Sequence, residues 1–322
     1  MSQHLKNWKF EKSKYMDIFR DPNSSYITEM VNDSFKSPDV SLLGFPYDGG
    51  ILSHRRGARL APDFIRKSFY NFTNYCSTHE TELSGLKVKD FGNLDLNGEG
   101  SHIYDLIQSD VERLYKFGKV EIILGGDHSI TLPSFKGLRR SVGNGNRNVN
   151  LVVIDQHYDV RDYNFVNSGS WLRHLLLDKN DKPDSTVILG SHGFRYPGYY
   201  AEFLKDKGVK TVSGHYIHTY GIRETVKEVA NILGGKGHTY LSVDIDAVDQ
   251  AFAPACSGSS PGGLMPYELL ELVRELVKNL NLDGVDITEY SPPFDIGDIT
   301  QKLAASVIME VLCGVKSKNG VK

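Results

Sequence analysis

Cysteine, long apolar runs and an excess of charge of one sign are scarce or absent in this sequence. The three cysteines, Cys76, Cys256 and Cys313, lie far apart and form no Cys-x-x-Cys pair. This spacing argues against a disulfide framework or a zinc ribbon and is typical of a reducing compartment. No apolar run approaches the ~20 residues of a transmembrane helix, and residues 1–30 lack the apolar core of a signal peptide. We therefore expect a soluble, cytoplasmic protein.

The charge balance gives no sign of a nucleic-acid or membrane partner. The formal net charge is −3 over 322 residues, so there is no electrostatic reason to expect binding to nucleic acid or to an anionic bilayer. A hydrophobic content of 40% suffices for a sizeable core, and no repeat, low-complexity segment or linker divides the chain. We predict an N-terminal extension over residues 1–38, packed on the domain or on a neighbouring subunit, and a single domain over residues 39–322.

Predicted strands and helices alternate along the whole chain. Strands are expected at 40–45, 87–91, 120–128, 151–154, 186–190, 210–212, 240–246 and 282–289. Helices are expected at 101–117, 131–140, 198–207, 221–233 and 266–280, with one more that begins at residue 61 and a last one capped by Asp298. This alternation predicts an α/β fold with a mostly parallel sheet covered by helices on both faces.

The stretch from Leu151 to Asp159 carries the strongest chemical signal. Four apolar residues, typical of a buried parallel strand, run directly into Asp155, His157 and Asp159. Alternate residues of an extended segment point the same way, and open α/β sheets place their sites at this end of a strand. Taken alone, the pattern also suits a capping aspartate with solvated neighbours.

Two further strands end in the same kind of residue, which favours a metal site. One runs to His128 and the other to Asp244 and Asp246. Two imidazoles and four carboxylates exceed the needs of one ion, and so much buried negative charge requires compensation. Two divalent ions that share bridging carboxylates satisfy both conditions. Nitrogen and oxygen ligands without thiolate favour Mn²⁺, then Fe, Co, Ni or Zn.

The motifs together resemble those of the ureohydrolase family, which includes arginase, agmatinase and formimidoylglutamase. The similar segments span roughly residues 40–313 in the family's order. They are Gly125-Gly126-Asp127-His128-Ser129, the Asp155, His157 and Asp159 triplet, and Ser242 with Asp244, Asp246 and Asp249, supported by Gly57-Ala58-Arg59, Pro261-Gly262-Gly263 and Glu289.

The resemblance implies a three-layer α/β/α arginase-like fold with two Mn²⁺ per subunit, in a homo-oligomer that is a trimer or hexamer. One ion would be held by His128, Asp155, Asp159 and Asp244, and the other by Asp155, His157, Asp244 and Asp246. Such enzymes hydrolyse a C–N bond at an amidine or guanidine carbon through a hydroxide shared by both ions. Asp159 would pass a proton to the leaving nitrogen, and Glu289 would bind the cationic head of the substrate.

The segment after Asp159 is most similar to formimidoylglutamases. Leu172 stands where arginases have a histidine, and Arg161, Ser168-Gly169, Arg173 and Leu175-Leu176 follow the formimidoylglutamase pattern. N-formimidoyl-L-glutamate carries two carboxylates, and arginine binds carboxylates in a bidentate manner. We predict Arg173 and then Arg195 as substrate ligands, although either could instead form a surface ion pair.

Alternatives remain open at this point. His174 could shuttle protons, which would favour a guanidino substrate such as arginine, agmatine or guanidinobutyrate with release of urea. Gln156, Gln250 and Trp171 depart from the family pattern. A family member without activity, serving as a regulatory subunit, is a third possibility. The basic loop 54–59 could form a rim for an anionic substrate or be a solvated loop with buried arginine stems.

Overall fold

The computed structural model describes residues 12–16, 20–96, 100–143, 148–235 and 237–318. Its main sheet has eight strands in the order β4-β1-β5-β10-β9-β6-β7-β8, and every pairing in it is parallel. The strands are β1 (Val40–Gly44), β4 (Val88–Asn93), β5 (Val120–Leu124), β6 (Val149–Ile154), β7 (Thr186–Ser191), β8 (Lys210–Ser213), β9 (His238–Asp244) and β10 (Leu282–Thr288). The predicted α/β class and parallel sheet are confirmed.

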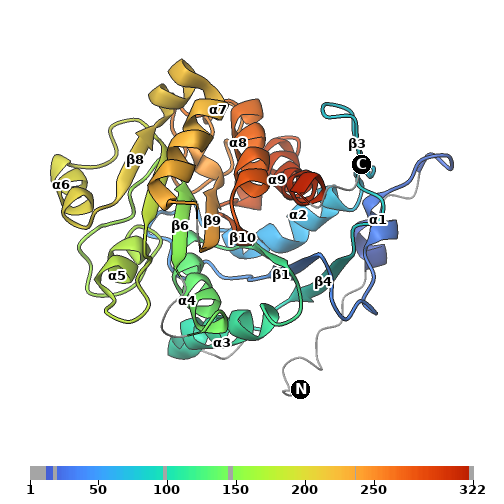
Figure 1. Cartoon of the computed structure of the whole chain (residues 1–322), viewed down its shortest axis with the longest axis horizontal. Helices are drawn as coiled ribbons and strands as arrows, with labels where there is room; N and C mark the ends of the chain where they lie inside the picture. The colour runs from blue at the N-terminus through green and yellow to red at the C-terminus, as the bar shows by residue number, and fades with distance from the viewer. Residues whose placement is uncertain (1–11, 17–19, 97–99, 144–147, 236, 319–322) are drawn as a thin grey trace.

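Helices cover both faces of this sheet, as Figure 1 shows. One layer contains α2 (Ala61–Phe69), α7 (Gly214–Leu233), α8 (Pro266–Asn279) and α9 (Ile299–Lys318). The other contains α3 (Ile103–Leu114), α4 (Thr131–Ser141), α5 (Trp171–Leu177) and α6 (Gly198–Asp206). The arrangement is the three-layer α/β/α architecture that the resemblance implies.

Alternation along the strands divides the core into two hydrophobic clusters. Leu42 and Val152 point to the α8 and α9 side, whereas their neighbours Leu43 and Val153 point to the α3 and α4 side. Every residue of β1, β5, β6 and β7 is buried. Burial of each large aliphatic side chain contributes roughly 1.5–3 kcal/mol, so the central strands form a rigid base for the residues that follow them.

The described part of the N-terminal extension packs on the domain. Ile27 and Met30 of α1 (Ile27–Met30) are buried in the α8 and α9 cluster. The Arg20 guanidinium donates hydrogen bonds to the backbone oxygen of Tyr70 and to the side chain of Asn71. Residues 1–11 and 17–19 of the predicted extension lie outside the described residues.

Several local features differ from the sequence-based expectation. Helix α5 forms within the predicted substrate loop, and a two-stranded hairpin of β2 (Tyr75–Cys76) and β3 (Thr81–Glu82) was not foreseen. Helix α7 begins at Gly214 and is interrupted at Gly221, where φ is 80° and ψ is 169°. The side chain that caps the start of α9 is Asp295 and not the predicted Asp298. Its carboxylate accepts the backbone N–H groups of Thr300 and Gln301.

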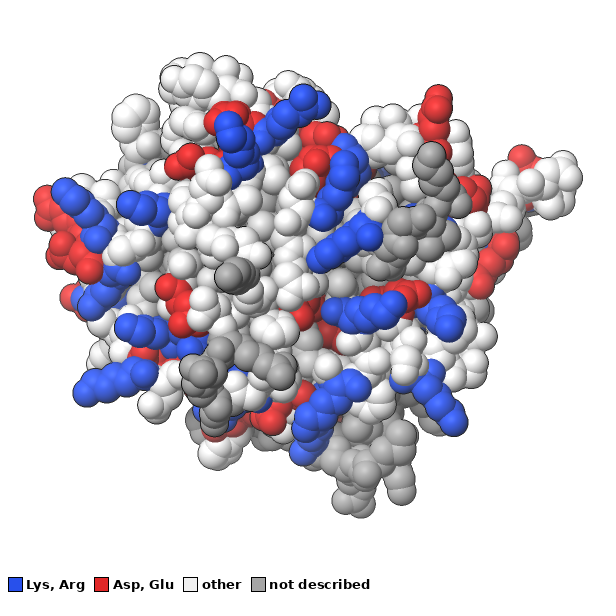
Figure 2. Space-filling view, in the orientation of Figure 1, with Lys and Arg blue, Asp and Glu red and all other residues white. Residues whose placement is uncertain are grey.

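Charged side chains of both signs are interspersed on the face of the molecule in Figure 2. Within the described residues, none of the helices combines the length and apolar character needed to cross a membrane.

Candidate metal centre

Three strands of the sheet centre bring the six predicted metal ligands to one edge of the sheet. In the order β5-β10-β9-β6, the chain beyond β5 provides His128, β9 with the turn after it provides Asp244 and Asp246, and the segment after β6 provides Asp155, His157 and Asp159. Because the strands are parallel, their carboxyl ends meet at the same edge. Strands β5, β9 and β6 therefore need no long loop to deliver these side chains.

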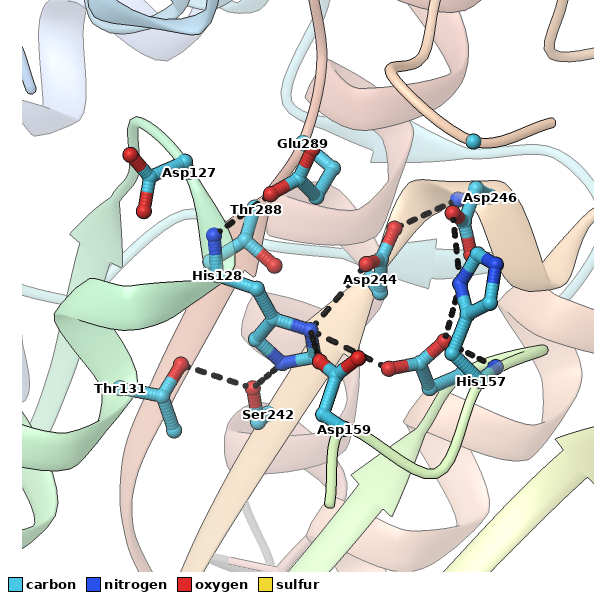
Figure 3. Close-up of polar contacts among 12 residues, drawn as sticks. Asp127, His128, Thr131, His157, Asp159, Ser242, Asp244, Asp246, Thr288 and Glu289 are labelled. Carbon is cyan, nitrogen blue, oxygen red and sulfur yellow. Dashed lines mark hydrogen bonds and ion pairs between the residues drawn. The ribbon is translucent and has the colours of Figure 1, made fainter. Parts of the chain in front are cut away.

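Two imidazoles face carboxylates at short range (Figure 3). The Nδ1 atom of His128 lies 3.2 Å from Asp155 Oδ2, 3.1 Å from Asp159 Oδ2 and 3.1 Å from Asp244 Oδ2. The Nδ1 atom of His157 lies 3.5 Å from Asp155 Oδ1 and 3.2 Å from Asp246 Oδ2. Asp155 thus faces both imidazoles. The ligand atoms of His128, Asp155 and Asp159 lie within 4.8 Å of one another, and so do those of Asp155, His157 and Asp246.

A hydrogen-bond network orients His128 towards these carboxylates. The hydroxyls of Ser242, Thr131 and Tyr240 donate to the Asp286 carboxylate over 2.6, 2.8 and 2.8 Å. Since the Ser242 proton is used in this way, its oxygen accepts the Nε2–H of His128 over 2.9 Å. The Nδ1 lone pair then points at three anions, an arrangement that a metal cation stabilises.

The buried polar atoms of the centre also fit a cation. Among the described residues, His128 Nδ1, Asp155 Oδ2 and Asp246 Oδ1 are buried without a hydrogen-bond partner. Burial opposes a charged imidazole, yet the facing carboxylates of Asp155, Asp159 and Asp244 raise the pKa of His128 well above its usual value. Burial, followed by the charges of Asp246 and Asp155, raises the pKa of Asp244. The donor set therefore matches a site for divalent cations.

Glu289 completes the base of the site from the end of β10. Its Oε1 accepts the backbone N–H of His128 over 2.8 Å, and its Oε2 accepts the hydroxyl of Ser257. Burial and then the nearby Asp127 raise the pKa of Glu289 to about 8. Glu289 and Asp159 have positive φ values of 66° and 48°. Non-glycine residues adopt this conformation at a cost of order 1–3 kcal/mol and often mark functional sites.

A pocket of about 180 Å³ opens above these residues. It is lined by Leu52, Ser53, His128, His157, Asp159, Arg161, Ser168, Gly169, Arg195, Asp244, Asp246, Ser257, Gly258 and Glu289. We call the carboxylates and imidazoles of the centre its floor and the two arginines Arg161 and Arg195 its wall. The floor residues are His128, Asp155, His157, Asp159, Asp244, Asp246 and Glu289. The pocket thus combines a negative floor with two positive side chains at its wall.

A model of the arginase family matches residues 38–314. The chain belongs to the arginase family. It is 31% identical to a formimidoylglutamase of Halalkalibacterium halodurans, with 88% of this chain and 89% of that protein covered. It is also 31% identical to a guanidinopropionase of Pseudomonas aeruginosa, over 85% of this chain and 86% of that protein. The solved structure of Bacillus subtilis formimidoylglutamase matches with a TM-score of 0.85 at 26% identity, covering 94% of this chain and 95% of that one.

Membership of the arginase family establishes a hydrolase of amidino C–N bonds whose family uses a binuclear metal centre. The resemblance inferred from the motifs is confirmed. The two His–Asp groups described above are where this arginase-family chain can bind metal ions.

Arg161 is a pocket residue for which the sequence gave a motif match but no role. Its guanidinium forms no hydrogen bond or ion pair recorded within the described residues, and it is half-buried. A Cβ atom at Gly169 would lie 2.9 Å from the Arg161 Cδ and Nε atoms, so a glycine at this position leaves room for the arginine. Arg195 is exposed, and its Nη2 lies 3.5 Å from the backbone oxygen of Gly258.

Arg173 and His174 do not line the pocket of this arginase-family chain. Both belong to α5, and the Arg173 guanidinium lies 3.1 Å from Asp162 Oδ1 and 4.4 Å from the ring centroid of Phe203. Arg173 therefore forms a surface ion pair in this structure, which the sequence left open as the alternative to a substrate ligand. His174 is half-buried, and the structure gives it no contact with the floor of the pocket.

Trp171 contributes to the centre in a way that the sequence did not reveal. Its indole Nε1 donates to Asp159 Oδ2 over 2.7 Å, and its ring centroid lies 4.8 Å from that of His128. The side chain is fully buried at the start of α5. In the sequence its size is only a departure from the family pattern, whereas the structure shows that this side chain contacts two of the predicted metal ligands.

The basic loop 54–59 supports backbone instead of forming the pocket wall. Arg55 donates to the backbone oxygens of Cys256 and Pro254 and stacks on Phe294. Arg59 lies 3.6 Å from the Asp48 carboxylate. None of the three arginines of this loop lines the pocket. The contacts therefore favour a solvated loop with buried arginine stems over a rim for an anionic substrate.

Proposed function

We propose that this chain hydrolyses N-formimidoyl-L-glutamate to L-glutamate and formamide. The observation that carries the proposal is the pairing of a carboxylate floor with Arg161 and Arg195 on the wall of the same pocket. The substrate has a cationic amidinium at one end and two carboxylates at the other, so its charges complement both parts of the pocket. Similarity to formimidoylglutamases in sequence and in structure supports the same assignment.

The metal ions of this proposal are two Mn²⁺. His128, Asp155, Asp159 and Asp244 would hold one, and Asp155, His157, Asp244 and Asp246 would hold the other. Bound ions of this kind lower the pKa of a shared water, which makes hydroxide available near neutral pH. The nitrogen and oxygen donors suit Mn²⁺ better than a sulfur-preferring metal.

The side chains of the pocket then bind, orient and move a proton. Glu289 pairs with the amidinium, which fixes the amidine carbon over the floor. Arg161 and Arg195 bind the two carboxylates and set the direction of the substrate. The carboxylate of Asp159 receives the proton of the attacking water and delivers it to the glutamate nitrogen as the C–N bond breaks. Formamide and the free amine of glutamate are the products, and the atoms balance with one water consumed.

A guanidino acid hydrolase that releases urea is the second candidate. The chain is equally similar, at 31% identity, to a guanidinopropionase and a guanidinobutyrase of Pseudomonas aeruginosa. Their substrates carry a guanidinium and a single carboxylate, which one wall arginine can bind. Agmatine is a poorer candidate, because it has no carboxylate and its distant amine is a cation that the arginines repel.

The test is steady-state hydrolysis by Mn²⁺-loaded protein on N-formimidoyl-L-glutamate, 4-guanidinobutyrate, 3-guanidinopropionate, arginine and agmatine. Formamide and urea are measured separately. We expect formamide from the first compound at the highest kcat/KM. Urea from a guanidino compound, with formimidoylglutamate inert, would retain the family chemistry and reject this substrate. Absence of turnover together with absence of bound metal would support a regulatory family member instead.

A further inference from the structure

A second cluster of potential ligands lies outside the pocket, between the β2–β3 hairpin and helix α9. Cys76 and His79 come from the hairpin, and Glu310 comes from α9. Their ligand atoms lie within 4.8 Å of one another. The Nε2 atom of His79 is 3.8 Å from Glu310 Oε2. None of these residues takes part in the proposed hydrolysis, so their convergence requires a separate explanation.

A fourth donor, Cys313, joins this cluster from α9. Residues three apart on a helix share a face, which places Cys313 beside Glu310. Both Cys313 and Cys76 are free thiols, and burial and then the neighbouring Cys76 raise the pKa of Cys313. Two elements distant in the sequence therefore present two thiols, an imidazole and a carboxylate at one place.

One polar atom of this cluster receives no hydrogen bond from the surrounding protein. Among the described residues, the buried Oε2 of Glu310 has no hydrogen-bond partner, and burial raises its pKa to about 7. The nearest guanidinium, Arg274, is held by Glu271 at 2.5 Å and by Glu275 at 3.0 Å, and its Nε is 3.8 Å from Glu310. The Oε2 atom of Glu310 therefore has only long ion-pair contacts, at 3.8 Å to Arg274 Nε and at 3.8 Å to His79 Nε2.

The imidazole of His79 is available as a neutral ligand. Burial and then the positive charge of Arg274 lower its pKa, so that the ring nitrogen offers a lone pair at neutral pH. A tetrahedral zinc ion with bonds of about 2.0–2.3 Å separates its ligand atoms by roughly 3.3–3.8 Å. The observed spacing of His79 and Glu310 approaches that separation, and the Cys76 thiol lies within 4.8 Å of both.

We propose that Cys76, His79, Glu310 and Cys313 form a structural site for one Zn²⁺. The thiol donors make this cluster chemically different from the oxygen- and nitrogen-rich centre of the pocket, because soft thiolates select Zn²⁺ over Mn²⁺. Four protein ligands leave no open position, which is the pattern of a structural and not a catalytic zinc ion. Binding releases the thiol protons as the sulfur–zinc bonds form.

The consequence of such a site is a fixed link between the hairpin and the last helix. The hairpin has only two residues in each strand, and a hairpin of this size has little stability of its own. One direct bond already joins the same regions, because Lys316 Nζ donates to the backbone oxygen of Ser84 over 2.7 Å. A zinc ion would add a stronger connection next to it.

Cobalt substitution of the full-length reduced protein tests the proposal. Co²⁺ bound to thiolate gives an intense near-ultraviolet charge-transfer band that carboxylate and imidazole ligands do not produce. We expect this band to saturate at one Co²⁺ per chain and to disappear in both Cys76→Ser and Cys313→Ser. Cys256→Ser is the matched control, since Cys256 is buried elsewhere with its thiol directed to the backbone oxygen of Ala253, and it should retain the band.

Stability provides the second readout and does not depend on hydrolysis. Zn²⁺ should raise the Tm of the wild type by several degrees and leave the Tm of Cys76→Ser unchanged, while His79→Asn should show a smaller rise. Absence of a thiolate band in the wild type would overturn the proposal. A Cys76–Cys313 disulfide in freshly purified protein that contains no zinc would overturn it as well. Retained Mn²⁺-dependent turnover in Cys76→Ser would show that the two sites are independent.

Discussion

The floor and the wall of the pocket are built in different ways. The floor residues follow the central strands β5, β10, β9 and β6, and most of them are buried. The two wall arginines, Arg161 and Arg195, lie on segments beyond β6 and β7 and are half-buried and exposed, respectively. The sheet therefore fixes the groups to which we assign the chemistry, whereas the loops carry the groups that we propose select the substrate.

The floor and the wall also differ in what holds their residues in place. Asp155 is held by β6 within a sheet whose register is set by burial on both faces, and a shift by one residue would reverse every side chain. Arg161 depends instead on a turn and on the space left by Gly169. Loops tolerate such changes, so relatives that share the floor can differ in substrate.

The largest predicted effect is on the floor, in Asp244→Asn. Loss of a carboxylate that faces His128 at 3.1 Å removes a group proposed to bind both ions. Since even the partners that orient metal ligands contribute 10- to 100-fold to affinity or activity, we expect kcat/KM to fall by more than ~100-fold. Metal content, measured by mass spectrometry, should fall in parallel. Asp162→Asn, an exposed carboxylate outside the pocket, is the control. Full metal content and full turnover in Asp244→Asn would refute the role given to the floor.

The second effect is on the wall, in Arg161→Ala. Loss of a charge-assisted pair with a substrate carboxylate is worth about 1.5–3 kcal/mol, which corresponds to a rise in KM of roughly 10- to 100-fold. Metal content and kcat should change little. Arg173→Ala serves as the matched control, since that arginine pairs with Asp162, and it should lower Tm without raising KM. A raised KM in Arg173→Ala together with an unchanged KM in Arg161→Ala would instead identify Arg173 as the substrate ligand.

A smaller effect is expected at the junction of floor and wall, in Trp171→Phe. This substitution keeps an aromatic ring beside His128 and removes only the N–H that donates to Asp159. Groups that orient metal ligands typically contribute 10- to 100-fold to metal affinity, and we expect about tenfold weaker Mn²⁺ binding by equilibrium dialysis. Unchanged affinity with unchanged turnover would make Trp171 a packing residue alone.

The smallest effect is expected for Arg195→Ala. Arg195 is exposed and makes only a 3.5 Å contact with Gly258, and exposed ion pairs contribute about 0.2–1 kcal/mol. KM for formimidoylglutamate should rise about two- to fivefold. A rise as large as that of Arg161→Ala would indicate that Arg195 becomes enclosed when the substrate binds.

The floor residues could be predicted because most of them stand directly after strands that their own local sequence specifies. A buried apolar run followed by alternating Asp155, His157 and Asp159 specifies both the strand and the direction of its ligands. The parallel pairing then brings His128 and Asp244 to the same edge without further information. Glu289 followed from the family motif, although its contact with the His128 backbone required the structure.

The wall could be predicted only in part: Arg195, an expected substrate ligand, lines the pocket, but Arg173 does not. Residues 171–177 form helix α5, which directs Arg173 to Asp162 and away from the pocket, and nothing local in the sequence determines this orientation. Trp171 and Asp159 are joined through tertiary packing across a loop. In the sequence Cys76 and Cys313 are far apart, and their proximity depends on how the hairpin docks on α9.

A competition experiment tests the division between floor and wall most directly. Wild type and Arg161→Ala, each loaded with Mn²⁺, receive equal concentrations of N-formimidoyl-L-glutamate and 4-guanidinobutyrate, and formamide and urea are measured together. We predict predominantly formamide from the wild type and a clear shift towards urea in Arg161→Ala at unchanged metal content. An identical product ratio in both proteins, with both rates reduced together, would contradict the account.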